Sequence, residues 1–152
     1  MSVLRFEMSR EPGAPATGFD MGDIQVTGNL GAVSSAGQKP SQSMMVYLAL
    51  VELLGGMSRL AETKSGNYAF TGVDSSFRLD FALTQAGVLT ISGRRSTQVA
   101  RTDLATLLVS VRNGVEQFLS HPDNQLASAD AVAGDLRDAR RAFEAALRRA
   151  GV

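Results

Sequence analysis

One carboxylate stands inside the most apolar segment of this chain, where its chemistry would be unusual. Glu52 lies in the middle of SMMVYLALVELLGGMSRL, residues 43–60, a segment with the composition of a helix that is buried almost all round. Burial without a partner raises the pKa of a carboxyl group, and such groups concentrate at functional sites. Two interpretations follow. Glu52 is a buried acid within reach of Arg59 or Arg112, or it lies on the most exposed strip of the helix, which is the simpler interpretation.

Three arginines form a second candidate site. Arg94, Arg95 and Arg101 bracket a segment that leads into a predicted helix beginning near Thr102. Helix N-termini attract anions, and guanidinium groups add paired hydrogen-bond donors. These residues are therefore candidates for holding a phosphate, a carboxylate or a nucleic-acid backbone. The alternative is a solvated loop whose charges serve solubility.

Other catalytic and metal-binding motifs are incomplete. GNLGAVSSAGQKPS, residues 28–41, lies between a predicted strand and a predicted helix, as a phosphate-binding loop does. However, five residues separate Gly31 from Gly37, and Lys39 is displaced by one position from its place in that motif. The chain has no cysteine, and its single histidine, His121, has the predicted role of a helix cap. The sequence therefore predicts no enzyme, no metal ion and no cofactor.

Hydrophobic spacing predicts the elements that must position these residues. Alternating apolar and polar residues predict strands at 3–8, 23–30, 67–72, 75–84 and 87–95. Apolar residues three and four apart predict helices at 41–62, 102–121 and 128–150. We expect the loops 9–22 and 31–42, rich in Gly, Pro and Ser, to be flexible. The chain is thus predicted to form one α+β domain over residues 1–152. Its antiparallel sheet has about five strands, and helices pack on one face. Along the chain, the order of elements is β-β-α-β-β-β-α-α.

The apolar helix predicted at 41–62 is too short to cross a membrane. Gly55 and Gly56 interrupt the apolar run after Leu54, whereas a span needs roughly 20 apolar residues. We therefore expect this helix to lie between the sheet and a second helix or a partner subunit. The two glycines weaken the helix by about 1 kcal/mol each relative to alanine, and they predict a close backbone contact or a bend.

The overall charge argues against two classes of partner. Fifteen basic and fifteen acidic residues cancel, so no global field draws the chain to nucleic acid or to an anionic membrane. Arginine supplies thirteen of the fifteen basic residues, which is typical of a GC-rich bacterial genome. The first residues lack a continuous apolar stretch, so we expect no signal peptide and a cytoplasmic location. Between Arg137 and Arg149, five arginines against two acids give +3, which we interpret as a solvated amphipathic face.

Few reactive groups on a well-specified scaffold favour a small, non-catalytic binding protein. We expect it to act through protein–protein contacts, as a regulatory or toxin-neutralising protein would. The predicted surface is the polar face of the sheet, with Arg5, Glu7, Arg78 and Asp80 as partner-binding residues; self-association through a helix is a second route. The alternative is a small-molecule or anion-binding protein, or a carboxylate-based enzyme, with its cleft between the sheet and helix 41–62.

Overall fold

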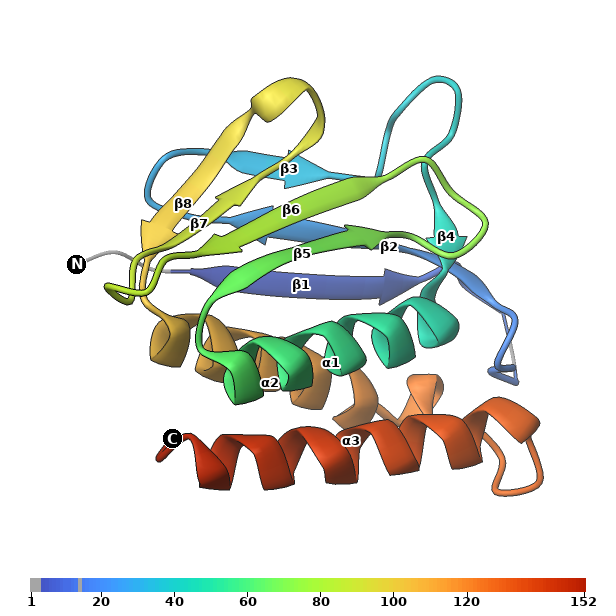
Figure 1. Ribbon diagram of the computed structural model, residues 1–152. Coiled ribbons are helices and arrows are strands. Elements are labelled where there is room, and N and C mark those ends of the chain that lie inside the picture. Colours follow the sequence, from blue (N-terminus) through green and yellow to red (C-terminus); the bar gives the residue numbers. More distant parts are fainter. Residues whose placement is uncertain (1–3, 14) are drawn as a thin grey trace.

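Figure 1 shows the computed structural model of this chain, which describes residues 4–13 and 15–152. Residues 1–3, where the first strand was predicted to begin, and residue 14, in the predicted loop 9–22, lie outside this range. Sheet A contains β1 (Arg5–Arg10), β2 (Met21–Thr27), β3 (Ala32–Ser34) and β4 (Met44–Met45). Sheet B is the meander β5 (Gly66–Thr71), β6 (Arg78–Leu83), β7 (Leu89–Ser92) and β8 (Gln98–Thr102). The helices are α1 (Val46–Thr63), α2 (Leu104–Ser120) and α3 (Ala131–Arg149).

The α+β class, the antiparallel pairing and the three helices are confirmed, with strands divided between two sheets of four. In sheet A, β2 pairs with β1, β3 and β4, with Phe6 opposite Val26 and Met8 opposite Ile24. The additional strands β3, β4 and β8 are two to five residues long. β3 and β4 carry too few alternations to be recognised from spacing alone, and in β8 the buried residues Val99 and Ala100 are adjacent rather than alternating. The flexibility expected for loops 9–22 and 31–42 stays a prediction.

The inner faces of both sheets and the buried side of α1 enclose one hydrophobic core. In Figure 1, α1 and α2 lie beneath the sheets. Helix α3 lies beneath these two helices and packs along α1. Ten residues of α1 are buried, and the largest of them contribute roughly 1.5–3 kcal/mol each. The prediction that this apolar helix is covered on two sides is therefore confirmed, with α3 of the same chain as the second cover. No helix within residues 4–13 and 15–152 has the length and apolar character needed to cross a membrane.

The helices begin later than predicted, α1 because of tertiary contacts and α2 because of a local side-chain cap. No side chain of the described residues caps α1; the N–H of Met45 donates to Val73 O at 3.0 Å and that of Val46 to Asp20 O at 3.2 Å. These bonds give partners to backbone donors at the start of the helix, which have none within the helix itself. Asp103 caps α2, one residue after the predicted start at Thr102, because its carboxylate accepts from the backbone N–H of Thr106 at 2.8 Å.

Close packing between layers depends on two glycines. A Cβ at Gly56 of α1 would lie 2.1 Å from the ring of Tyr68 on β5, whereas one at Gly55 would meet no atom within 4 Å. A Cβ at Gly114 of α2 would lie 2.4 Å from the carbonyl oxygen of Phe6 on β1. The close contact predicted for the glycine pair of α1 thus belongs to Gly56, and Gly114 lets α2 lie directly on sheet A.

Candidate functional site

Glu52 lies on the exposed side of α1, which agrees with the simpler of the two interpretations. The side chains that α1 turns inward, including Leu50, Leu53 and Met57, are fully buried, so they fill the space where the cleft was predicted. The backbone oxygen of Glu52 accepts a hydrogen bond from the Tyr68 hydroxyl at 3.0 Å. The guanidinium of Arg59 lies 5.3 Å from the centroid of the same ring. Glu52 is therefore part of a surface cluster around an aromatic ring.

The three arginines predicted as an anion site do not all come together. Arg94 and Arg95 lie in η1 (Arg94–Ser96), a single 3-10 turn at the tip of the β7–β8 hairpin. Arg101 lies on β8, six residues from Arg95, which is about 20 Å along an extended chain. The side chain of Asn29 holds the backbone of Arg101 through bonds of 2.9 and 3.1 Å. Residues 98–102 form a strand because β7 and the turn at residues 28–31 supply partners on both sides.

The four predicted partner-binding residues lie on two different sheets. Arg5 and Glu7 are on β1 of sheet A, and Arg78 and Asp80 are on β6 of sheet B. Each pair forms its own ion pair, with N–O distances of 3.9 and 2.8 Å. The hydrogen bond to Asp80 and the negative charge of Asp80 raise the pKa of Arg78 above the ordinary value for arginine. The predicted polar surface is therefore divided between two sheets. Its closest charges, Arg78 and Asp80, are already paired with each other.

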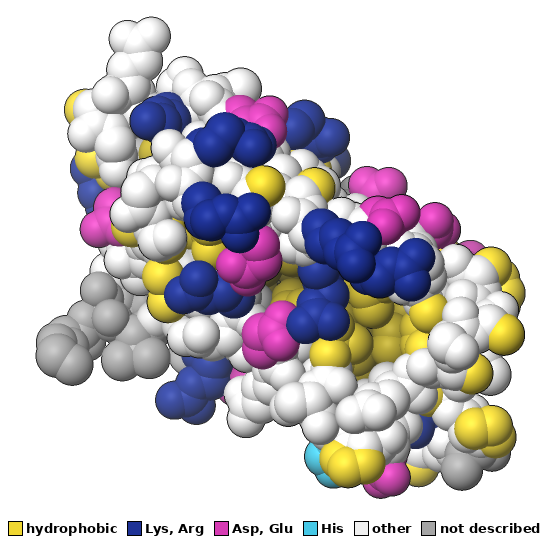
Figure 2. Space-filling view, turned by 90° about the horizontal axis from the view of Figure 1, so that it is seen from below, with side chains coloured by type: hydrophobic (Ala, Val, Ile, Leu, Met, Phe, Trp, Pro, Cys, Tyr) yellow, Lys and Arg dark blue, Asp and Glu magenta, His cyan; other side chains and the backbone are white. Residues whose placement is uncertain are grey.

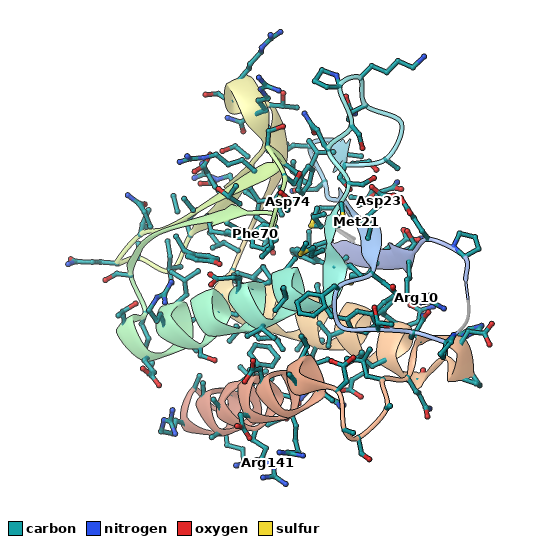
Figure 3. The ribbon with its side chains drawn as sticks, turned by 90° about the vertical axis from the view of Figure 1, so that its right-hand side faces the viewer. Arg10, Met21, Asp23, Phe70, Asp74 and Arg141 are labelled. Atoms are coloured by element: carbon teal, nitrogen blue, oxygen red, sulfur yellow. The ribbon has the colours of Figure 1, made fainter. Side chains whose placement is uncertain are left out.

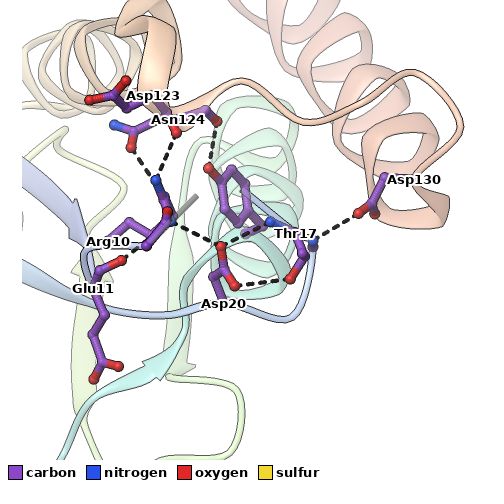
Figure 4. A network of polar contacts seen from close by, with 10 residues as sticks. Arg10, Glu11, Thr17, Asp20, Asp123, Asn124 and Asp130 are labelled. Carbon is purple, nitrogen blue, oxygen red and sulfur yellow. Dashed lines mark hydrogen bonds and ion pairs between the residues drawn. The ribbon is translucent and has the colours of Figure 1, made fainter. Parts of the chain in front are cut away.

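A polar network, shown in Figure 4, holds the β1–β2 loop against the turn at residues 122–124, which follows α2. The Arg10 side chain is only 7% exposed and forms an ion pair of 3.1 Å with Asp20. It also donates to the carbonyl oxygens of Gly13 at 2.7 Å and Asp123 at 2.8 Å, and to Oδ1 of Asn124 at 3.3 Å. Spacing patterns gave no signal for this network, because most of its members lie in loops. Its polar groups satisfy one another, which indicates a structural role.

The carboxylate of Asp20 has several donors. Its oxygens accept from the backbone N–H and the hydroxyl of Thr17, both at 2.9 Å, as well as from Arg10. Burial acts to raise the pKa of Asp20, but the hydrogen bonds from Thr17 and the charge of Arg10 outweigh it, so the pKa is lowered. The Tyr47 hydroxyl donates to the carbonyl oxygen of Asn124, which ties the buried side of α1 to the same network.

A groove runs between α2 and α3 on the face shown in Figure 2. One part, of about 330 Å³, has a mixed lining, in which Leu119, Leu126, Ala133 and Leu136 stand beside Asn124, Gln125, Arg137 and Arg140. The adjoining part, of about 520 Å³, is lined by Glu116, Arg137, Arg140, Arg141, Glu144 and Arg148. Arg137 and Arg140 line both parts, so the two parts form one continuous groove. In Figure 2, arginine side chains stand beside a hollow with hydrophobic walls.

This groove exists because α3 packs on α1 rather than on α2. The buried residues of α3 are Val132, Leu136, Phe143, Ala146 and Leu147. Between α2 and α3 the links are polar: Arg140 donates to Glu116, and Arg112 lies 4.0 Å from Glu144. Leu119 and Leu126 remain half-buried beside these ion pairs.

The rim of the groove carries excess positive charge. Four arginines against Glu116 and Glu144 give +2 for the basic part of the groove, and both glutamates are engaged by arginines. Within the described residues, Arg141 and Arg148 form no ion pair. Arg141 projects outward from α3 in Figure 3. The excess of arginines counted along α3 in the sequence thus lines one side of this groove. Helix periodicity alone does not reveal the groove itself.

Comparisons with protein-family models, curated proteins and solved structures found no match. Across residues 4–13 and 15–152, no group of three or more His, Asp or Glu side chains is placed to hold a metal ion. The groove between α2 and α3 is our candidate functional site, on the grounds of its shape, its cluster of apolar side chains and its charge.

Proposed function

We propose that this chain is a binding protein without catalytic chemistry of its own. It recognises an acidic, amphipathic helical segment of a partner protein in the groove between α2 and α3. The observation that carries this proposal is the combination, in one groove, of a cluster of apolar side chains with a rim of arginines (Figure 2). Regulatory or toxin-neutralising roles, a bacterial source and a cytoplasmic location remain predictions supported by composition alone.

The dimensions of the groove suit a helix. It follows α3 from Ala133 to Arg148, about 22 Å at 1.5 Å per residue, or roughly four helical turns. An amphipathic helix laid along it places apolar residues spaced three and four apart against Leu119, Leu126 and Leu136. Pockets for small metabolites are usually deeper concavities that enclose most of the ligand. A long, open groove is better matched to a chain segment.

The charges favour an acidic partner. Arg141 and Arg148 have no ion pair within the described residues, and their guanidinium groups suit the bidentate recognition of carboxylates. Arginine is also enriched in protein–protein interfaces and among their most important residues. A nucleic-acid partner is less well supported, because the lining holds leucines and alanine rather than aromatic rings on which bases stack.

Peptide selection tests this proposal directly. Random sixteen-residue peptides displayed on phage are selected against the immobilised protein, and the enriched sequences are synthesised. We expect enrichment of acidic peptides with apolar residues at helical spacing. Arg137→Glu combined with Arg141→Glu should weaken their binding by about tenfold or more, because each reversal replaces attraction with repulsion.

A matched variant controls for net charge. Arg94→Glu combined with Arg95→Glu makes the same change in charge at the β7–β8 turn and should leave peptide binding unchanged. Leu126→Ser tests the apolar lining and should also weaken binding. Failure to enrich acidic amphipathic peptides, or equal binding to the native protein and to the variant reversed at positions 137 and 141, contradicts the proposal.

A further inference from the structure

A second groove, of about 400 Å³, opens on the side of the molecule opposite to α3. It lies between the β3–β4 loop, residues 35–43, and the tip of the β7–β8 hairpin, which both rise above the sheets in Figure 1. Lys39, Arg78, Arg94 and Arg95 line it, and its described lining contains no acidic residue. In a chain whose total charge is zero, this is a marked local concentration of positive charge.

The loop that forms one wall is anchored at both ends. The hydroxyls of Ser35 and Ser43 donate to the same oxygen, Oδ1 of Asp23, at 2.7 and 2.9 Å. Figure 3 shows Asp23 at the base of this loop. Close to the second anchor, the Ser75 hydroxyl donates to the carbonyl oxygen of Gln42 at 2.6 Å. These bonds fix the position from which Lys39 extends.

The opposite wall is a tight turn packed against sheet A. The N–H of Gly93 donates to Thr97 O at 2.7 Å, and the Thr97 hydroxyl donates to Arg94 O at 2.9 Å. Arg95 adopts the left-handed conformation, with φ of 58°. A Cβ at Gly93 would lie 2.8 Å from a methyl carbon of Val33, so the turn rests directly on β3. Packing therefore sets the spacing of the two walls.

The lining combines apolar, polar and charged groups. Phe77 is only 4% exposed and lies with Val33 among the lining residues, which also include Ser34, Gln38 and Thr97. Arg78 is paired with Asp80, but within the described residues Lys39, Arg94 and Arg95 form no ion pair. Like charges gathered around one cavity repel each other unless an anion compensates them.

We propose that this groove binds a small, multiply charged oxyanion of the phosphate-ester or polycarboxylate class. Guanidinium groups hold such oxygens through paired hydrogen bonds, and the volume falls within the range of small-molecule sites. The groove assembles Arg94 and Arg95, predicted from sequence, with Lys39, which lies more than fifty residues away along the chain. This site is independent of the groove between α2 and α3.

Calorimetric titration at low ionic strength tests the proposal with sodium pyrophosphate and with sodium citrate. Potassium chloride at matched ionic strength is the control for non-specific screening. We expect saturable binding of at least one anion, weakened by about tenfold or more in Arg94→Ala combined with Arg95→Ala, because charge-assisted hydrogen bonds are lost. Arg5→Ala combined with Arg149→Ala removes the same charge at exposed positions that line neither groove, and should change the affinity by less than about twofold.

The outcomes separate the possible ligands and the possible errors. Binding of pyrophosphate alone identifies a phosphate site, binding of citrate alone identifies a carboxylate site, and binding of both shows selection by charge alone. Lys39→Gln, on the other wall, should weaken the same titration and serves as the test if the hairpin variant fails to fold. Absence of saturable binding by either anion, or equal weakening in the two double arginine variants, overturns the proposal.

Discussion

Gly55 and Gly56 of α1 should respond in opposite directions to the same substitution. Alanine is about 1 kcal/mol more favourable than glycine in a helix interior. A Cβ at Gly55 meets no atom within 4 Å, so Gly55→Ala should stabilise the fold by about that amount. A Cβ at Gly56 would lie 2.1 Å from the ring of Tyr68. Gly56→Ala is therefore accommodated only if that ring moves away.

The cost of moving Tyr68 follows from its contacts. Its ring stacks on Phe81 with centroids 5.8 Å apart, lies 5.3 Å from the Arg59 guanidinium, and its hydroxyl donates to Glu52 O at 3.0 Å. An aromatic pair contributes about 0.5–1.5 kcal/mol, a cation–π contact about 0.5–1, and a hydrogen bond about 0.5–1.5. After subtraction of the helical gain, Gly56→Ala should destabilise the protein by about 0.5–3 kcal/mol.

Urea denaturation followed by circular dichroism measures both variants, with equal slopes as the condition for comparing midpoints. Burial and the charge of Glu52 raise the pKa of Tyr68 to about 12, against the lowering effect of Arg59. Displacement of the ring should return that pKa toward about 10, which the ultraviolet absorbance of the phenolate reports. The native protein should lose stability as the pH rises from about 10 toward 12, because only the folded state resists ionisation of Tyr68. Equal stability of the two alanine variants, with an unchanged tyrosine titration, would refute the reasoning.

Two further predictions concern packing and pH. Gly114→Ala should destabilise the fold by about 1–3 kcal/mol, because its Cβ would lie 2.4 Å from the backbone oxygen of Phe6 and α2 must move away from β1. Gly134→Ala on α3, whose nearest neighbour is a flexible Arg137 nitrogen at 3.7 Å, should instead stabilise by up to about 1 kcal/mol; thermal melts that rank the two equally would contradict both. Because the pKa of Asp20 is lowered in the folded state, its contribution is present above about 3.9 and is lost as the pH falls through the folded value. Asp20→Asn should flatten this acid limb of the stability profile, and an unchanged limb would show that other carboxylates dominate it.

Hydrophobic spacing was sufficient to predict the fold class and the principal elements. Phe77, Leu79, Phe81 and Leu83 alternate along the chain, and all four are buried in the core. The segment at 43–60 has apolar residues around most of its helical circumference, which required cover on two sides, and α3 provides the second cover. Both inferences depend on the repeat of a helix or a strand, which is a property of neighbouring residues alone.

Local pattern could not determine where the strands divide into two sheets or where the helices begin. Met44 and Met45 continue the apolar pattern of α1, yet they pair with β2. The backbone of β2 offers them hydrogen-bond partners, and α1 begins after them without a side-chain cap from any described residue. Residues 98–102 form β8 because β7 and the 28–31 turn offer partners that lie far away in the sequence. The division of the strands also separates Arg5 from Arg78, which an expected single sheet had placed on one surface.

By itself, the sequence determined that this chain is an α+β protein with a doubly covered apolar helix and few reactive side chains. Only the tertiary structure decided which surfaces are hollow. The groove between α2 and α3 forms because α3 packs on α1, and the second groove forms because the loops that carry Lys39 and Arg94 become its two walls. Periodicity states which face of an element is apolar, but many faces compete for one core. Which pairs are formed depends on the summed free energy of long-range contacts, and the surfaces left unpaired become the candidate binding sites.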